Sequence, residues 1–147
     1  MKTQGWTEVK FHKPEDVEDN QLKYAVIMAW YDGGWLFVRH AARETWEIPG
    51  GRREAGEKIE HTAERELSEE TGSSSFQLIP ICVYSVNSDT GESFGFLYYA
   101  DNITLGNRLQ HEICEVKIFH NLPENLTYPA IQPFLFKKVI DTISRKS

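Results

Sequence analysis

The chain has 147 residues, of which 40% are hydrophobic and 26% are charged, a composition typical of one globular domain and not of a disordered chain. Its net charge of −6 argues against nonspecific nucleic-acid binding through a basic face, but it does not exclude a nucleotide substrate. An acidic protein can bind polyphosphates when divalent cations supply positive charge locally, so the charge favours a metal-assisted site over a lysine-rich one.

Signals for membranes or secretion are weak in this sequence. The longest apolar run, residues 24–30, is too short to span a bilayer, and no basic and then apolar leader precedes the first patterned segment. The two cysteines, Cys82 and Cys114, show neither metal-ligand spacing nor a disulfide framework. We therefore expect a cytosolic protein with one domain over residues 1–147. We expect it to be a monomer or homodimer, with no membrane partner and no stable nucleic-acid partner.

The first predicted element is a β-hairpin. Residues 24–31 are rich in β-branched and aromatic side chains, and residues 35–39 read as the returning strand after a turn at Asp32-Gly33-Gly34. A short apolar piece, residues 46–48, then runs into Pro49-Gly50-Gly51, which breaks regular structure.

A helix is predicted next, over residues 57–71, because this segment lacks Gly and Pro and is followed by Gly72 as a C-terminal cap. A short hinge at Ser73-Ser74-Ser75 follows it. Three further strands are predicted, at residues 76–86, 93–100 and 115–119. A final helix is predicted over residues 131–144, and its apolar contacts are expected to include Phe134, Val139 and Ile140. Strands mixed with two helices predict an α/β fold in which helices cover a sheet.

The helix over residues 57–71 carries carboxylates where an apolar stripe is expected. With Glu66 at zero and about 100° per residue, the stripe is formed by three residues at about 20°, 60° and 100°, namely Ile59, Ala63 and Leu67. Glu70 lies at about 40°, inside the stripe, and Glu69 lies at about 300°. Three carboxylates thus crowd onto or near the face that should be buried.

A solvated acidic face is the alternative interpretation, with Arg65 and Glu69 as an i,i+4 pair. Burial of an unpaired carboxylate is costly, however, and neighbouring negative charges increase the cost. A divalent cation would neutralise such a cluster. Oxygen ligands without a paired histidine favour Mg²⁺ or Mn²⁺ over Zn²⁺.

The glycines before this helix supply a second feature. Gly50 and Gly51 allow the backbone to approach a ligand closely, although a Pro-Gly-Gly segment is equally consistent with a plain turn. Arg52 and Arg53 follow at once, where they would either bind phosphate or remain solvated.

Together these residues resemble the motif of the Nudix hydrolases, G-x5-E-x7-R-E-U-x-E-E-x-G-U, in which U is a bulky aliphatic residue. Residues 51–73 match the motif through Gly51, Glu57, Arg65, Glu66, Leu67, Glu69, Glu70 and Gly72. Ser73 departs from it where the family has an aliphatic residue, a difference that concerns packing at the helix end and not chemistry. The likeness extends to residues 46–50 and to residues 112–119 leading into residues 122–124.

The resemblance implies an α/β/α sandwich with a mixed sheet, in which the motif forms a loop–helix–loop. It implies that the metal ligands are Glu66, Glu69, Glu70 and the Gly50 carbonyl, supported by Glu57. Arg65 would orient Glu69 through a charge-assisted hydrogen bond. Glu66 is alternatively the base that takes the proton from the attacking water.

The implied reaction is metal-dependent hydrolysis of a nucleoside diphosphate linked to another group. Mg²⁺ or Mn²⁺ would offset phosphate charge, and a carboxylate would deprotonate the water that attacks one phosphorus in line. Residues 119–126 resemble bacterial relatives that hydrolyse canonical and 8-oxo-guanine deoxynucleoside triphosphates, which favours conversion of a nucleoside triphosphate to a monophosphate and pyrophosphate. The alternatives are another nucleoside diphosphate derivative, pyrophosphate removal from RNA 5′ ends, and a noncatalytic nucleotide-binding module.

Residues outside the motif are expected to complete the site. Many relatives use an additional glutamate as base or ligand, and Glu112 is the first candidate here because a loop position would let it reach the metals. Glu115 and Glu92 are the other candidates. Substrate contacts are expected from four residues near the glycines, namely Arg39, Arg43, Trp46 and Arg52. The five histidines show no paired metal spacing, so they are interpreted as surface or packing residues.

Overall fold

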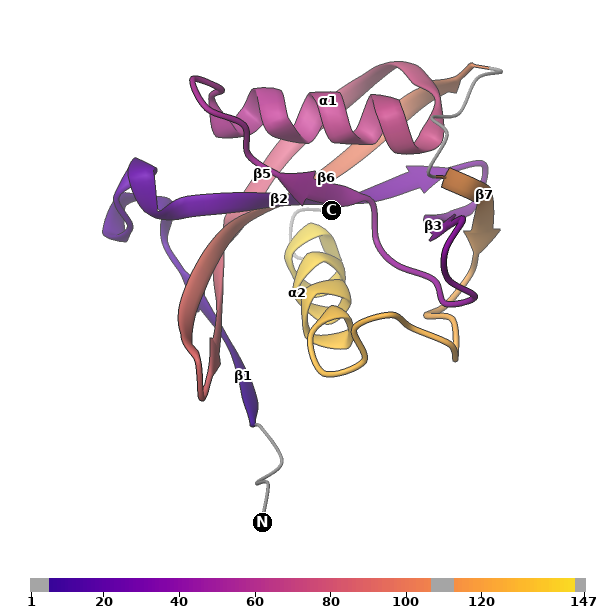
Figure 1. Cartoon of the computed structure of the whole chain (residues 1–147). Coiled ribbons are helices and arrows are strands. Elements are labelled where there is room, and N and C mark those ends of the chain that lie inside the picture. Colours follow the sequence, from indigo (N-terminus) through magenta and orange to yellow (C-terminus); the bar gives the residue numbers. More distant parts are fainter. Residues whose placement is uncertain (1–5, 107–112, 145–147) are drawn as a thin grey trace.

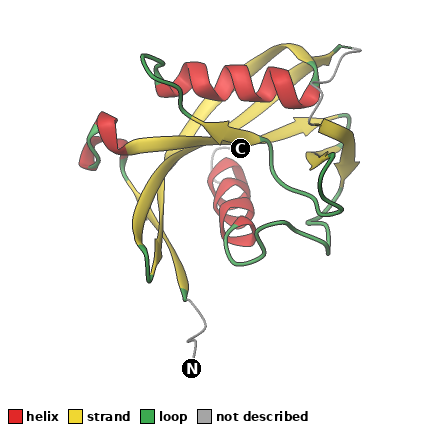
Figure 2. Ribbon diagram, viewed as in Figure 1, coloured by secondary structure: helices red, strands yellow, loops and turns green. Residues whose placement is uncertain are grey.

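A computed structural model of the chain describes residues 6–106 and 113–144 (Figures 1 and 2). In this part of the chain a sheet runs in the order β1-β5-β6-β2-β3-β7, and β4 pairs with β2. The strands are β1 (Thr7–His12), β2 (Leu22–Tyr31), β3 (Gly34–His40), β4 (Gly50–Arg52), β5 (Ser73–Ser88), β6 (Gly91–Leu105) and β7 (Ile113–Phe119). β2 is parallel to β6 and antiparallel to β3 and β4, so the predicted mixed sheet is confirmed.

The helices α1 (Ile59–Thr71) and α2 (Gln132–Ser144) lie on opposite faces of this sheet, as Figures 1 and 2 show. Two short 3₁₀ helices, η1 (Pro14–Asp16) and η2 (Asp19–Gln21), precede β2. No helix in the described ranges combines the length and the hydropathy needed to cross a bilayer.

Successive side chains of β2 point to opposite faces of the sheet and contribute to two hydrophobic cores. Ala25 and Ile27 belong to the cluster that includes Ala63 and Leu67 of α1. Met28, which points to the other face of β2, belongs to the cluster that includes the buried residues of α2. The sheet is therefore buried on both faces, as the α/β/α arrangement requires.

The predicted hairpin is confirmed, with its turn at Asp32 and Gly33. Both residues have positive φ, 50° and 83°, which is the geometry of a two-residue turn that matches the twist of the flanking strands. β1, by contrast, was not predicted from the sequence; it is an edge strand that pairs with β5.

The hinge predicted at Ser73-Ser74-Ser75 is wrong, because β5 begins at Ser73. Gly72 takes the left-handed conformation at φ 78° and turns the chain directly from α1 into the strand. Ser73 is buried where the family has an aliphatic side chain. Its hydroxyl is hydrogen-bonded to the Thr71 hydroxyl, and its carbonyl accepts from Ser68 Oγ at 2.6 Å, so its polar groups are satisfied.

The expected apolar contact of Phe134 is also wrong, because this side chain is 54% exposed. α2 begins at the buried Gln132, and its buried face continues through Leu135, Phe136 and Val139. This i, i+3, i+4, i+7 pattern leaves Phe134 about 200° around the helix from Gln132. Of the two other predicted contacts, Val139 is buried and Ile140 is half-buried.

Replacement of Leu67, which is fully buried against β2, should destabilise the protein. We expect Leu67→Ala to lower the free energy of unfolding by about 2–5 kcal/mol through lost burial and a residual cavity. The exposed Phe134→Ala should change it by less than about 0.5 kcal/mol. Urea titrations followed by circular dichroism measure both values, and equal effects would contradict the two-core packing described above.

Candidate functional site

Gly50 and Gly51 lie in β4, which packs between β2 and α1. A Cβ atom at Gly50 would overlap the Ala25 carbonyl of β2, and one at Gly51 would overlap the Glu66 carboxylate of α1. Close approach to the backbone of β2, and not an unusual φ angle, therefore requires glycine at Gly50, whereas a side chain at Gly51 would displace the Glu66 carboxylate. This approach brings the backbone of β4 directly against the carboxylates of the helix.

Glu57 is clamped by Arg65. The Arg65 Nε donates to Glu57 Oε2 at 2.7 Å and its Nη2 donates to Oε1 at 3.0 Å, which is a bidentate pair. The Glu54 N–H and the Thr62 hydroxyl also donate to Glu57, at 3.0 and 2.7 Å. Chiefly through Arg65, these donors hold the pKa of Glu57 at about 2. The clamp fixes the loop that precedes α1 to the helix.

Arg65 also contacts the other acidic residues and β4. Its Nη1 donates to Glu66 Oε2 at 3.1 Å and to Glu69 Oε1 at 3.4 Å, and its Nη2 donates to the Arg52 carbonyl at 3.1 Å. The Arg65–Glu69 contact expected from the sequence is thus present, but it is the longest of these bonds. The principal partner is Glu57, which precedes the helix and so has no helical spacing that could have revealed it.

Glu70 is buried beneath β4, with 7% of its surface exposed. Its Oε1 accepts the Gly50 N–H at 2.9 Å. Burial raises the pKa of Glu70 to about 8, and the negative charges of Glu66 and Glu47 add to this effect. Burial also raises the pKa of Glu66, with partial compensation from Arg65. The helical-wheel prediction that Glu70 lies inside the buried stripe is confirmed.

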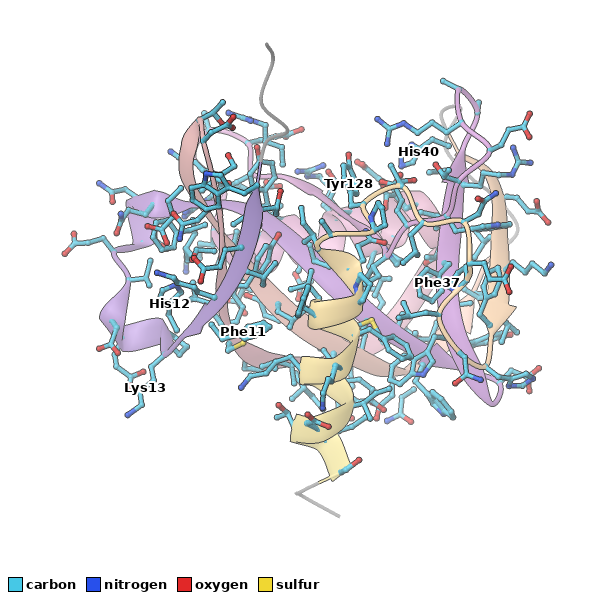
Figure 3. The ribbon with its side chains drawn as sticks, turned by 90° about the horizontal axis from the view of Figure 1, so that it is seen from below. Phe11, His12, Lys13, Phe37, His40 and Tyr128 are labelled. Atoms are coloured by element: carbon cyan, nitrogen blue, oxygen red, sulfur yellow. The ribbon has the colours of Figure 1, made fainter. Side chains whose placement is uncertain are left out.

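His40, labelled in Figure 3, lies at the end of β3 and adjoins two acidic residues. Its Nε2 lies 3.4 Å from Glu47 Oε2 and 3.5 Å from Glu70 Oε2. From the sequence, His40 is interpreted as a surface or packing residue, because a lone histidine in a strand gives no signal for this position. The contact with Glu70 forms because β3 packs against α1.

The donor chemistry around β4 fits a hard divalent cation. Glu70 binds the Gly50 N–H, the Glu66 carboxylate lies against Gly51, and Glu69 shares Arg65 with Glu66. Carboxylate oxygens are the ligands that Mg²⁺ and Mn²⁺ prefer. Within residues 6–106 and 113–144, no three His, Cys, Asp or Glu side chains form a ready-made ligand set. The carboxylates instead accept hydrogen bonds from Arg65 and from Gly50.

A cavity of about 380 Å³ lies beside β4, between the sheet and α2. Its apolar part is formed by Val26, Tyr84, Val86, Ile131 and Leu135. Gly50, Gly51 and Arg52 of β4 line it as well. A ligand in this cavity therefore meets apolar side chains and, at β4, the strand that covers Glu66 and Glu70.

Of the predicted substrate residues, Arg52 lines this cavity and Arg43 contacts residues that line it. Arg52 lines it, and its Nη1 donates to the Tyr24 hydroxyl at 3.3 Å. Arg43 donates to the hydroxyl of Tyr128, another lining residue, at 3.4 Å and to Glu47 at 3.2 Å. Tyr128 lies in the loop that leads into α2, as Figure 3 shows. Each arginine thus adjoins a tyrosine of the cavity.

The other two predicted substrate residues lie elsewhere. Arg39 donates to the Arg43 carbonyl at 3.2 Å and to Glu115 at 3.4 Å. Trp46 packs edge-on against Phe119, with ring centroids 5.0 Å apart, and does not line the cavity.

The additional glutamates were predicted as bases or ligands. Glu115 lies on β7 and pairs with Arg39 across the strands. Glu92 is exposed near the start of β6, where it accepts from Asn87 Nδ2 at 3.2 Å. Glu112, the first candidate, lies outside the described residues.

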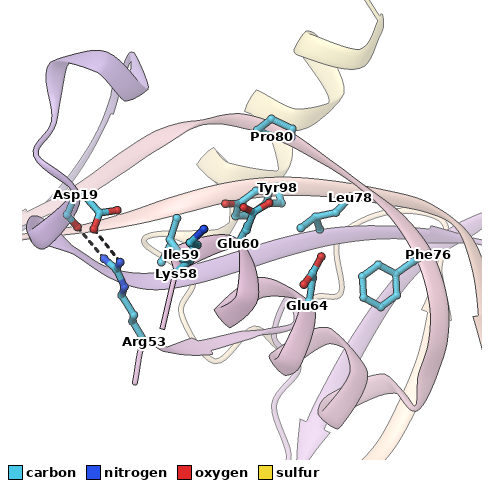
Figure 4. Close-up of a pocket in the computed structure, with 10 residues that line it drawn as sticks. All are labelled: Asp19, Arg53, Lys58, Ile59, Glu60, Glu64, Phe76, Leu78, Pro80 and Tyr98. Carbon is cyan, nitrogen blue, oxygen red and sulfur yellow. Dashed lines mark hydrogen bonds and ion pairs between the residues drawn. The ribbon is translucent and has the colours of Figure 1, made fainter. Parts of the chain in front are cut away.

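A second, larger cavity of about 660 Å³ lies beside Glu60 and Glu64 of α1 (Figure 4). There, Arg53 donates to the Asp19 carboxylate at 2.8 Å and ties η2 to the motif loop. None of the predicted metal ligands lines this cavity. The smaller cavity beside β4 is therefore the candidate active site.

Comparison with known proteins gives consistent results. A family model described as NUDIX domain matches residues 8–137. YtkD of Bacillus subtilis (strain 168), named as a candidate 8-oxo-dGTP diphosphatase, is 33% identical over 127 residues, which are 84% of this chain and 78% of YtkD.

Solved structures agree with this match. A mutant of the Bacillus subtilis pyrophosphohydrolase BsRppH has a TM-score of 0.75 and 26% identity, over 94% of this chain and 92% of that one. The MutT NUDIX hydrolase from Burkholderia pseudomallei has a TM-score of 0.63 and 21% identity, over 79% of this chain and 95% of that one, and it shows the same fold. Nudix hydrolases generally use divalent metal ions. The chain therefore belongs to the NUDIX domain family and is a hydrolase.

Proposed function

We propose that the protein hydrolyses a nucleoside triphosphate, canonical or oxidised in the manner of 8-oxo-dGTP, to a nucleoside monophosphate and pyrophosphate. One observation carries this proposal: the cavity with apolar walls also includes β4, and Glu66 and Glu70 adjoin that strand. A nucleobase bound in the apolar part of the cavity would direct the phosphates of the substrate toward these carboxylates. The 33% identity to YtkD, with its name, supports the same substrate class.

We propose that Gly50, Glu66, Glu69 and Glu70 hold Mg²⁺ or Mn²⁺, with Glu57 supporting them. When bound there, the cation offsets phosphate charge and lowers the pKa of a coordinated water. It would also offset the crowding of negative charge that raises the pKa of Glu66 and Glu70. Glu70 is already held in place by the Gly50 N–H, so its carboxylate needs little reorganisation.

In the reaction, one water adds to the α- or β-phosphorus while the anhydride bond between these two phosphates breaks, so that pyrophosphate or the nucleoside monophosphate leaves. A carboxylate takes the proton from this water, and the candidates are Glu66, Glu92, Glu112 and Glu115. Arg65 positions Glu66 and Glu69 through its hydrogen bonds and is itself fixed by Glu57. Arg52 and Arg43, beside the cavity, supply positive charge for the phosphates.

Removal of pyrophosphate from triphosphorylated RNA 5′ ends is the second candidate function. Tyr128 and the Arg43 side chain, at the loop beside the cavity, are 43% and 45% exposed, so they are open to a following nucleotide. The similarity to the pyrophosphohydrolase BsRppH supports including this substrate in the tests.

Activity should depend on the acidic residues of α1. We expect Glu66→Gln and Glu70→Gln each to lower kcat by roughly a hundredfold or more, because each removes a carboxylate from the proposed metal and base set. Glu64→Gln is the matched control, since it makes the same charge change at an exposed position of the same helix.

The measurement is a screen with Mg²⁺ and Mn²⁺ that reads pyrophosphate and inorganic phosphate separately. Its panel contains canonical and 8-oxo nucleoside triphosphates, ADP-ribose, nucleotide sugars, dinucleoside polyphosphates and triphosphorylated RNA. Turnover retained in both Gln variants would place the metal elsewhere. No turnover of any nucleoside triphosphate would contradict the proposed function.

Glu70→Gln should also change how stability depends on pH in EDTA. The pKa of Glu70 is about 8 in the fold against an ordinary value of 4.5, so folding takes up a proton between these values. The stability associated with protonated Glu70 is complete below pH 4.5 and is lost as the pH rises through 8. Relative to Glu70→Gln, the wild type should lose on the order of a few kcal/mol over this range. Urea titrations measure the difference, and parallel pH profiles would contradict the burial of an ionisable Glu70.

The pH dependence of turnover should also reflect the ionisation of Glu70. At a fixed low Mg²⁺ concentration, we expect activity to rise with pH through about 8, because Glu70 must lose its proton to bind a cation. More Mg²⁺ should move this rise to lower pH by mass action. An acid optimum that does not respond to Mg²⁺ would rule out this account.

A further inference from the structure

The larger cavity, which Figure 4 shows with its lining residues, has no part in the proposed reaction. Its volume is about 660 Å³, and it is lined by Glu60 and Glu64, which lie one helical turn apart on α1. At about 100° per residue, both lie roughly 80° or more around the helix from Glu66 and Glu70. The cavity is therefore separate from the carboxylates proposed to hold the metal.

The two carboxylates of this cavity have no partner in the fold. Within residues 6–106 and 113–144, neither Glu60 nor Glu64 makes a hydrogen bond or an ion pair. Lys58 also lines the cavity but pairs with neither of them, and Arg53 donates to the Asp19 carboxylate at 2.8 Å. Two like charges one turn apart repel each other, so a cation between them would be favourable.

Tyr98 of β6 presents a buried hydroxyl to the same cavity. The residue is 4% exposed, its ring stacks on Phe96 with centroids 4.6 Å apart, and it belongs to the core cluster that includes Leu67. No described residue is hydrogen-bonded to its hydroxyl, although that oxygen is not sealed inside the protein. Burial and the negative charges of Glu60 and Glu64 raise the pKa of Tyr98, so the hydroxyl stays protonated. A buried hydroxyl held in place without a partner is unusual and leaves its oxygen for a ligand.

The chemistry of these oxygens suits an ammonium group. A primary ammonium has three N–H donors and no acceptor, and the cavity presents acceptor oxygens on Glu60, Glu64 and Tyr98. Tyrosine hydroxyls are not among the usual ligands of Mg²⁺ or Ca²⁺, so a hard divalent cation is less suited. The rest of the wall includes apolar side chains that could cover methylene groups, namely Ile59, Phe76, Leu78 and Pro80.

We propose that this cavity binds a small primary aliphatic amine. Its ammonium group donates to Glu60, Glu64 and Tyr98, and its methylene groups lie against the apolar wall. Lys58 would repel a second ammonium group, so the ligand carries one. This binding site does not depend on the proposed hydrolysis, and neither is tested by the failure of the other.

The test uses n-pentylamine and 1-pentanol, which share a chain and differ in the ammonium group. Each is titrated into the full chain in excess Mg²⁺, which competes for other acidic groups, and methyl ¹³C NMR follows the binding. We expect n-pentylamine to shift the methyl signals of Ile59 and Leu78, with a Kd at least roughly tenfold below that of 1-pentanol. No saturable binding, equal affinities, or shifts confined to Ile131 and Leu135 of the other cavity would each overturn the proposal.

Two substitutions test the groups that bind the ammonium. Tyr98→Phe removes only a hydroxyl that has no partner among the described residues, so the fold should be kept, and Glu60→Gln removes one charge at an exposed position. Each should raise the Kd of n-pentylamine by roughly tenfold. Tyr31→Phe and Glu15→Gln make the same changes away from the cavity and should leave this Kd unchanged. An unchanged Kd in Tyr98→Phe would show only general attraction to an acidic surface and would overturn the proposed site.

Discussion

The close packing of β4 between β2 and α1 is the constraint on which the site depends. A side chain at Gly50 would meet the backbone of β2, and one at Gly51 would meet the Glu66 carboxylate. The Gly50 N–H also binds Glu70 directly. A larger residue at Gly50 would therefore push β4 away from β2, and one at Gly51 would displace the Glu66 carboxylate.

This packing brings several carboxylates into a buried region, where a negative charge is energetically costly. Arg65 offsets part of it, and Glu57 anchors Arg65 so that one guanidinium serves Glu57, Glu66 and Glu69 at once. Among the described residues Arg65 makes no hydrogen bond to Glu70, and burial raises the pKa of that carboxyl to about 8. Such crowding lowers stability without a cation, which is the usual relation between a preorganised site and the stability of its fold.

The cavity has a different origin from the acidic cluster. It forms because α2 packs against the sheet face away from α1, while the loops around Ile48 and Tyr128 close its sides. Residues far apart in the sequence therefore meet there. Gln132 reaches Ile48 across 84 positions, and Arg43 reaches Tyr128 across 85. The acidic cluster and the cavity thus lie on opposite faces of one sheet and meet at β4.

The sequence by itself determined the hairpin at Asp32-Gly33, the helix ending at Gly72, the burial of Glu70 and the membership of the family. These features depend on local conformation or on fixed spacing within one segment, and such signals survive in a single sequence. Only the tertiary structure decided that Glu57 is the main partner of Arg65, that His40 adjoins Glu70, and that Phe134 faces solvent while Gln132 faces the cavity. Those contacts depend on how separate elements pack, because periodicity states which residues share a face but not what that face meets.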